Sequence, residues 1–443
     1  MALLERAGYR LVLDPGEADV ALVNTCAFIE AAQRESIERI LELAALKGTG
    51  PLRVLLVTGC LAERHGAELL REIPEIDGLL GPGRCARVAG VTRGLLDGGG
   101  PRVLVGGLQL RPAWGPRAPT GSPHVAYVKI AEGCSHACHF CLIPRLRGPQ
   151  RSRPAGQIVA EVARLGEEGV REVILVAQDT TAYGRDLAQG GNLAALLRRL
   201  NNLAAPEWIR LLYTHPQRWN EELIDLFAAG GRVLPYVDLP VQHASDRVLE
   251  AMGRGRTGRR VRELITRLRA RIPGVILRAT IMTGHPGEGE REFSELIRFL
   301  REFPFDRLGA FAYSPEPETR AAAASGRPAG RVARERRARV LALQKGIALE
   351  RQRTREGQSC VVLIDGVQPG KGRWLARSYG EAPDIDGVIR VRASGQGETV
   401  EPGEFRRVRI VKAGPYDFWA VPEEKPRRLP GPRGPRGTRK EAG

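Results

Sequence analysis

Apolar and polar residues follow one another along this chain in a pattern that changes at residue 357. Before it, short apolar runs precede stretches with helical spacing; after it, apolar residues recur with a period of two. Strands that alternate with helices are typical of parallel α/β sheets, and short period-two strands are typical of small β-barrels. The chain is therefore predicted to be α/β, with parts of different architecture.

Residues 1–97 are expected to form an open α/β domain of the flavodoxin-like type. The predicted strands are YRLVLD, ADVALVN and RVLLVTG, and the predicted helices lie at 28–46, 64–73 and 84–96. Cys26 follows the second strand and Cys60 follows the third. Because open α/β sheets bind ligands at the carboxyl ends of their strands, both thiols are candidate metal ligands. Their alternative role is that of small buried side chains.

Residues 122–317 repeat a strand-then-helix unit six times, after a Gly- and Pro-rich linker at 98–121 that contains one short strand. Six units predict a partial (β/α)6 barrel. The strands are expected at 125–130, 172–178, 208–214, 236–242, 275–283 and 308–314, and the helices at 156–166, 192–203, 221–229, 259–271 and 290–303.

Residues 318–356 are predicted to be a helical connection dense in arginine: Arg334, Arg336, Arg337, Arg339, Arg351, Arg353 and Arg355. A solvated helix face is the alternative to a binding face here. Residues 357–422 are expected to form a small β-barrel, whose Trp374, Tyr379 and Phe405 suit an RNA or ribosomal surface. The Pro-, Gly- and Arg-rich residues 423–443 are expected to be disordered.

The stretch AEGCSHACHFC, residues 131–141, carries the candidate chemistry. It follows the first strand of the barrel and places three cysteines on one loop: Cys134, Cys138 and Cys141. Three thiolates leave one iron of a cluster open to another ligand, whereas structural zinc sites close four positions. Zinc with His136 or His139 as fourth ligand is the alternative, and the second Cys/His pair of a zinc ribbon or finger is not found in the sequence.

Further polar residues follow the other barrel strands, where the loops of such barrels carry the site. They are Gln178, Asp179, Thr214, His215, Gln242, His243, Gly284, His285, Gly287 and Glu288. Each of them alone is equally well explained as a capping or turn residue. Together they are predicted to surround the cysteine loop.

Composition limits the class of protein and its partners. The chain of 443 residues is 42% hydrophobic, and no apolar run approaches the roughly 20 residues of a membrane span. Seven cysteines without a secretory signal favour a reducing compartment, and we expect the cytoplasm. The net charge of +17 favours a polyanionic partner such as RNA or the ribosome.

At EGCSHACHFC, with Phe140 before the last cysteine, the chain resembles the radical S-adenosylmethionine (SAM) superfamily. The resemblance implies a [4Fe-4S] cluster on Cys134, Cys138 and Cys141, with SAM on the open iron and cleavage of SAM to methionine and a 5′-deoxyadenosyl radical. It further implies that Gln178, Asp179, Arg278, Thr280, Gly284 and Glu288 line the SAM pocket.

VNTCAFIEAAQRESIERI, VTGCLAERH, ILVAQDTTAYGRDL and LPVQHASDRVLEAMGRG resemble the methylthiotransferases, and the β-rich end resembles their TRAM domain. This resemblance implies a second, auxiliary [4Fe-4S] cluster on Cys26 and Cys60. In that family the third ligand lies on a loop that would precede Met1, so we expect this cluster to be held weakly. Cys85, in a helix-forming stretch, is a poor substitute.

Two branches of that family differ in substrate. One modifies isopentenyladenosine in tRNA, and the RimO-type branch modifies the β-carbon of an aspartate in ribosomal protein S-twelve. NTCAFIEAAQRES and ARSYGEAPDIDGVI resemble the RimO type, and Glu381, Asp384 and Asp386 suit a basic protein partner. The resemblance implies an electron donor such as flavodoxin or ferredoxin, an unassigned sulfur donor, a possible rRNA contact and no membrane. A zinc-containing RNA-binding protein is the alternative of another class.

Overall fold

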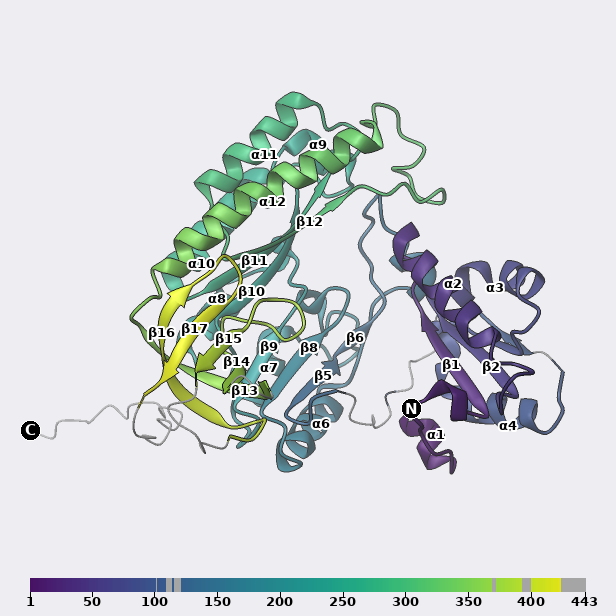
Figure 1. Ribbon diagram of the computed structural model, residues 1–443. Coiled ribbons are helices and arrows are strands. Elements are labelled where there is room, and N and C mark those ends of the chain that lie inside the picture. Colours follow the sequence, from purple (N-terminus) through teal and green to yellow (C-terminus); the bar gives the residue numbers. More distant parts are fainter. Residues whose placement is uncertain (101, 109–113, 115–120, 369–371, 393–399, 424–443) are drawn as a thin grey trace, which may run out of the picture.

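The computed structural model describes residues 1–100, 102–108, 114, 121–368, 372–392 and 400–423. A half barrel lies in the middle, with an open α/β domain on one side and a closed β-barrel on the other (Figure 1). These three expected architectures are confirmed. No helix of the described residues is long and apolar enough to cross a membrane. Residues 424–443, expected to be disordered, lie outside the described ranges.

The N-terminal domain is a parallel sheet with strand order β1-β2-β3-β4. Helices α2 and α3 pack on one face of it and α1 and α4 on the other, so β2 is buried along its whole length. The bounds are α1 Ala2–Arg6, β1 Val20–Thr25, α2 Glu30–Ala44, β2 Val54–Gly59, α3 Cys60–Glu72, β3 Gly78–Leu80, α4 Val88–Leu96 and β4 Arg102–Leu104. β4 is the short strand expected in the Gly- and Pro-rich stretch, and it completes this sheet.

The strand predicted at YRLVLD, residues 9–14, is wrong. Leu13 is fully exposed and Leu11 is 41% exposed. In the described structure β1 pairs with β2 alone, so this stretch has neither a ladder partner nor a buried face. Apolar alternation produces a strand only where a neighbouring strand and a core are available.

Six parallel strands and the helices between them form the half barrel, close to the positions that the sequence predicts. The strands are β5 Val125–Lys129, β8 Glu172–Val176, β9 Trp208–Leu211, β10 Tyr236–Gln242, β11 Ile276–Thr283 and β12 Arg307–Ala312. The covering helices are α6 Ala155–Glu167, α7 Leu193–Asn201, α8 Glu221–Ala229, α9 Asp246–Ala251, α10 Gly258–Arg271 and α11 Glu290–Glu302.

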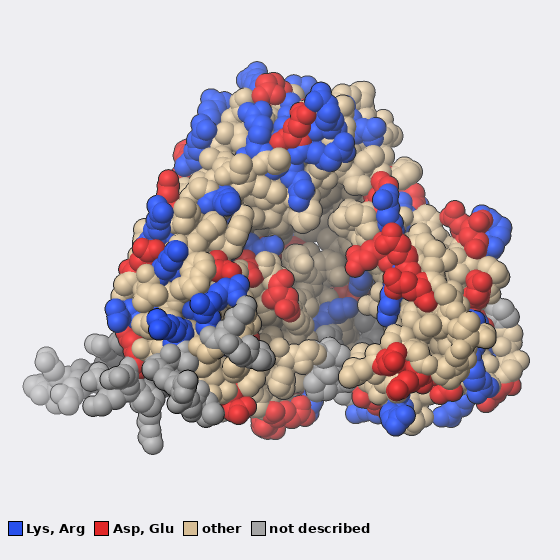
Figure 2. All heavy atoms as spheres, in the orientation of Figure 1, with Lys and Arg blue, Asp and Glu red and all other residues tan. Residues whose placement is uncertain are grey.

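The half barrel consists of two three-stranded sheets, β5-β8-β9 and β10-β11-β12. The Thr214 amide donates a hydrogen bond of 2.9 Å to the Asp238 carbonyl and so links the two sheets. Strand residues that face the helices, such as Val173 and Leu277, are completely buried. The other face of the strands is concave, and the surface is hollowed there, with basic atoms visible inside the hollow (Figure 2).

The C-terminal part is a closed barrel of five strands around a core that contains Trp374 and Phe418. Its strands are β13 Ser359–Gln368, β14 Arg373–Arg377, β15 Ile389–Arg392, β16 Phe405–Ala413 and β17 Phe418–Pro422. The expectation that Trp374, Tyr379 and Phe405 suit an RNA or ribosomal surface is wrong for Trp374, which is buried, while Tyr379 and Phe405 are half-buried against the half barrel. Trp374 is 2% exposed, Phe405 packs edge to face on Trp208, and the Tyr379 hydroxyl donates to the Gly274 carbonyl at 3.0 Å.

The β-barrel docks on the amino ends of the half-barrel strands through buried charges. Glu172, the first residue of β8, accepts a hydrogen bond of 2.6 Å from Arg377 of β14. Glu381 accepts hydrogen bonds from Arg307 at 2.9 Å and from Arg355 at 3.0 Å. Because buried charges are stable only when they are paired, these contacts fix how the two parts are oriented.

This network also corrects the prediction that three acids face a protein partner. Glu381 has no exposed surface, and the Asp386 carboxylate accepts the Tyr236 hydroxyl at 2.7 Å. Asp384 alone of the three is exposed. The prediction is wrong for the other two because Arg307 and Tyr236 of the half barrel, and Arg355 after α12, bind them.

The arginine-dense helix, α12 (Gly330–Arg353), lies along β12 and α11 (Figure 1). Arg336 binds the Glu288 carboxylate at 2.8 Å, Arg337 donates to the Ala310 carbonyl at 2.9 Å, and Arg351 binds Asp306 at 2.6 Å. These arginines therefore fasten the helix to the half barrel, while Arg334 and Arg353 remain exposed.

Candidate active site

The three-cysteine loop begins where β5 ends, at the carboxyl edge of the half barrel. Gly133 precedes the first cysteine with φ +79°, and a Cβ there would lie 2.2 Å from the Pro149 carbonyl oxygen. Only glycine fits such a position without moving the backbone. The Cys134 amide donates to the Gly148 carbonyl at 3.1 Å, which holds the start of the loop against the segment that follows it.

The thiols of the loop lie in an environment that suits metal-bound thiolates. The His136 and Ile143 amides point at the sulfurs of Cys134 and Cys141, both at 3.5 Å. Burial, followed by Asp179 and Cys138, raises the pKa of Cys134. Burial, followed by the two neighbouring thiols, raises the pKa of Cys141 to about 12. A bound cation is what deprotonates such thiols at neutral pH. No group of three His, Cys, Asp or Glu side chains in the described residues is already drawn together at metal-binding spacing.

Both histidines of the loop are held by protein contacts. The His136 ring binds the Asp179 carboxylate at 2.6 Å and stacks on His215 with ring centroids 4.1 Å apart. The His139 ring binds the Ala251 carbonyl at 3.0 Å. Each contact engages one ring nitrogen, and together they fix the orientation of both imidazoles and of the loop that carries them.

Asp179, a predicted pocket residue, lies in the middle of the contacts that hold this loop. Its carboxylate binds His136 and the Arg218 guanidinium, the latter at 3.0 Å, and it accepts the Thr181 amide at 2.9 Å. Hydrogen bonds from His136 and Thr181 lower its pKa against the opposing effect of burial, and the group is 2% exposed. Burial lowers the pKa of His215 to about 3, so the ring beneath His136 is neutral.

Gln178, two residues after β8, and Thr280, on β11, are both half-buried. The Oε1 atom of Gln178 is buried and has no hydrogen-bond partner in the described structure. Burying an unpaired amide oxygen costs free energy, so this atom is available to a polar ligand. Of the other residues predicted after the strands, Thr214, His215, Gln242, His243 and His285 are all buried.

Gly284 and Glu288 hold α12 against the half barrel. The buried Glu288 carboxylate accepts the Gly284 amide at 2.8 Å and the Arg336 guanidinium at 2.8 Å. Gly284 has φ +79°, and a Cβ on it would lie 2.2 Å from the Cβ of Ala333. Both predicted pocket residues therefore lie at the carboxyl end of β11, with their polar groups directed to the chain itself.

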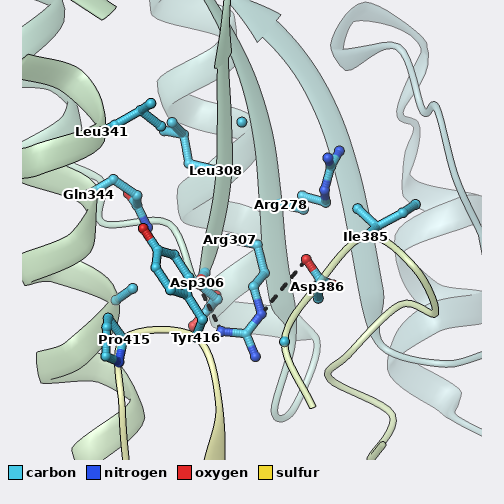
Figure 3. Close-up of a pocket in the computed structure, with 13 residues that line it drawn as sticks. Arg278, Asp306, Arg307, Leu308, Leu341, Gln344, Ile385, Asp386, Pro415 and Tyr416 are labelled. Atoms are coloured by element: carbon cyan, nitrogen blue, oxygen red, sulfur yellow. Dashed lines mark hydrogen bonds and ion pairs between the residues drawn. The ribbon is translucent and has the colours of Figure 1, made fainter. Parts of the chain in front are cut away.

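Arg278 lies near the amino end of β11, away from the cysteine loop. It binds Asp238 at 2.9 Å and lines a cavity of about 330 Å³ together with Arg307 and Asp386, between the half barrel, α12 and the β-barrel (Figure 3). Arg278 lies on the same face of β11 as Thr280, two residues before it, whereas Gly284 and Glu288 follow the far end of the strand.

Cys26 and Cys60 lie side by side at the carboxyl edge of the N-terminal sheet. Thr25 and Gly59, the last residues of β1 and β2, are paired in register, and the two cysteines follow them directly. A Cβ on Gly59 would lie 2.4 Å from the Thr25 carbonyl oxygen, so only glycine allows this approach. Burial raises the pKa of Cys60, with Cys26 close enough to raise it further.

The N-terminal sheet edge faces the half barrel through α5 (Ile143–Arg147), the short helix after the cysteine loop. Leu142 and Leu146 belong to the hydrophobic core of the N-terminal domain. The Arg147 guanidinium lies close enough to Cys60 to lower the pKa of its thiol, against the larger effect of burial, and it binds Glu132 at 2.9 Å. The chain therefore brings the two predicted cysteine sets to one interface.

Cys85 lies in a 3-10 helix at Pro82–Arg87, where its sulfur is 3.5 Å from the Thr58 hydroxyl. It is exposed, and the groups that perturb the Cys60 pKa do not include it. The prediction that it is a poor third ligand stays a prediction.

Several residues that organise the site were not found by sequence reasoning: Arg147, Arg218, Arg64 and Glu316. Arginine and glutamate are abundant throughout the chain, and the sequence does not show which arginine pairs with which glutamate. Arg64 and its partner Glu318, for example, lie 254 residues apart in the sequence.

Family models match the three folded parts. The radical SAM superfamily model matches residues 128–300, the model described as "Uncharacterized protein family UPF0004" matches residues 1–81, and the TRAM domain model matches residues 357–422. Among solved structures, the radical SAM methyltransferase TsrM from Kitasatospora setae aligns with a TM-score of 0.51 and 17% identity, over 72% of this chain and 68% of that one. This likeness shows a shared fold.

Curated relatives match the chain almost from end to end. The ribosomal protein uS12 methylthiotransferase RimO of Desulforudis audaxviator (strain MP104C) is 47% identical, over 95% of this chain and 92% of the relative. The enzyme of the same name from Pelotomaculum thermopropionicum is 44% identical, over 94% of each. The resemblance read from the cysteine motifs is confirmed, and the chain belongs to the RimO family of radical SAM methylthiotransferases.

Proposed function

We propose that this protein adds a methylthio group to the β-carbon of an aspartate in ribosomal protein uS12, with SAM as methyl donor and as radical source. The observation that carries the proposal is the meeting of two cysteine sets at one interface, in a chain that is 47% identical to a uS12 methylthiotransferase over 95% of its length. Methylthiolation needs both a radical source and a sulfur source, and this arrangement offers a place for each.

The residues present offer three thiols for one [4Fe-4S] cluster and two thiols, Cys26 and Cys60, for a second. Cys134, Cys138 and Cys141 would hold the SAM-binding cluster, because they lie together on one loop and amide groups already point at two of the sulfurs. Cys26 and Cys60 would hold the auxiliary cluster. When bound, the first cluster and SAM supply a radical that takes hydrogen from an unactivated C–H bond.

The chain's own residues orient these groups. Gln178, with its unpartnered amide oxygen, and Thr280 would contact SAM from the concave side of the half barrel. Asp179, Gly284 and Glu288 would shape the pocket by fixing the cysteine loop and α12. The hollow on the concave side would admit the substrate loop of uS12 (Figure 2).

The remaining partners follow from the chemistry. SAM cleavage takes one electron, so a low-potential donor such as flavodoxin or ferredoxin must dock, and a sulfur source must reload the auxiliary cluster. The excess of positive charge on the chain, +17, suits contact with rRNA around uS12. We place the reaction in the cytoplasm, where ribosomes are assembled.

The proposal is tested with the reconstituted protein under anaerobic conditions. Small ribosomal subunits and unmodified tRNA are offered separately with SAM and a reductant, and each product is analysed by mass spectrometry. We expect methylthiolated aspartate in uS12 and its loss in Cys138→Ser. Methylthiolated tRNA without modified uS12 would refute the proposal and assign the chain to the other substrate.

A further inference from the structure

The loop after β12, residues 314–321, connects the N-terminal domain to the cysteine loop of the half barrel. We call it the junction loop. Glu316 of this loop is 4% exposed and lies 2.7 Å from the guanidinium of Arg64 on α3, whose side chain is 5% exposed. The ion pair thus crosses the domain interface out of contact with solvent, where screening by salt is weak.

Arg64 holds the junction loop next to the cysteines of the N-terminal domain. Its Nη1 atom also donates a hydrogen bond of 3.0 Å to the carbonyl of Ala27, the residue that follows Cys26. Its Nε atom binds Glu318 of the junction loop at 2.7 Å. A planar guanidinium that uses two nitrogens in this way fixes direction as well as distance.

The opposite side of the junction loop is bonded to the three-cysteine loop. The Ala321 amide donates a hydrogen bond of 2.9 Å to the carbonyl of His139, which lies between Cys138 and Cys141. Glu318 also binds Arg145 of α5 at 3.0 Å. One arginine is therefore linked through a single loop to both cysteine sets.

We infer that Arg64 and Glu316 are positioning residues that hold the two cysteine sets at the spacing required for sulfur transfer. The inference rests on the proposed function, in which hydrogen is taken from the substrate carbon at one set and the same carbon would take up sulfur held at the other. SAM cleavage itself needs the barrel loop alone, whereas methylthio transfer needs both sets in fixed relation. Loss of the ion pair should therefore lower methylthio transfer relative to SAM cleavage.

The test compares Arg64→Met, Glu316→Gln and Arg64→Lys with Arg34→Met, a matched control on α2 whose ion pair with Glu30 is exposed at 69% and 75%. In the reconstituted holoenzyme, methylthiolated uS12 per 5′-deoxyadenosine is measured. We expect this ratio to fall about 10- to 100-fold in the first two variants, since misplacement near 1 Å has effects of that size. Arg64→Lys should recover part of it, and the control should match wild type.

A second measurement needs no cluster. Hydrogen–deuterium exchange of the protein without iron should show faster exchange at residues 314–321 in Arg64→Met and Glu316→Gln, with β2 still protected. Unchanged exchange there, or an unchanged product ratio in both variants, would overturn the inference. If wild type cleaves SAM but leaves uS12 unmodified, the proposed function fails, and the exchange measurement still decides whether the two residues hold the interface.

Discussion

Glu381 offers a direct test of how the β-barrel is held on the half barrel. Its carboxylate has no exposed surface and contacts Arg307, Arg355 and the amide and hydroxyl of Ser378. Replacement by glutamine keeps the shape but removes the charge, so two buried guanidinium groups lose their counterion. The structure predicts that Glu381→Gln destabilises the docked β-barrel.

The magnitude follows from the pKa of this carboxyl. Burial raises it, but Arg355, Arg307 and Ser378 more than compensate and lower the pKa from an ordinary 4.5 to about 2. At about 1.36 kcal/mol per pKa unit, the charged form stabilises the fold by about 3 kcal/mol. Because the folded-state pKa is depressed, this contribution is fully present above pH 4.5 and is lost as pH falls toward 2.

The assay is urea unfolding of wild type, Glu381→Gln and the exposed control Glu335→Gln, followed by the fluorescence of the barrel tryptophans. We expect a loss of about 3 kcal/mol from pH 5 to 8 for Glu381→Gln and less than about 0.5 kcal/mol for the control. The gap between wild type and Glu381→Gln should narrow below pH 4.5. Equal stability of Glu381→Gln and the control at pH 7 would refute the reasoning.

Three further outcomes are expected. Gly59→Ala places a Cβ 2.4 Å from a carbonyl oxygen at φ +103°. We expect it to lower the free energy of urea unfolding of the N-terminal domain by about 2 to 4 kcal/mol. The control Gly90→Ala, which has open space around its Cβ, should cause no loss of stability. Gly284→Ala, which meets α12 at 2.2 Å, should make that helix more sensitive to protease. Cys360, whose pKa burial raises to about 11, should react with iodoacetamide at pH 8 far more slowly than the exposed Cys26.

The architecture could be read from the sequence because its periodicities are strong. Each of the six barrel strands is an apolar run bounded by turn residues, and each lies at or beside its expected position. The strand at residues 9–14 failed because alternation does not reveal whether a partner strand exists. Sheet pairing is a long-range property, and it was inferred correctly only where helices separated the strands.

The parts of the candidate site that could be predicted from the sequence are the cysteines that directly follow strands. The cysteine loop and the neighbouring pair Cys26 and Cys60 were found in this way, since the carboxyl edge of a parallel sheet gathers its loops. The acids Glu381 and Asp386 were misassigned because a sequence does not show which arginine will bind which carboxylate. Arg64 and Glu316 escaped notice for the same reason.

The two cysteine sets differ in how they come together, and this has a consequence for maturation in the cell. Cys134, Cys138 and Cys141 lie within eight residues, so a loosely folded chain can already gather their thiols around iron. Cys26 and Cys60 meet only because β1 and β2 pair with Thr25 opposite Gly59. Iron delivered to a newly made chain can therefore be taken up at the first set early, whereas the second set has to wait until its sheet has formed.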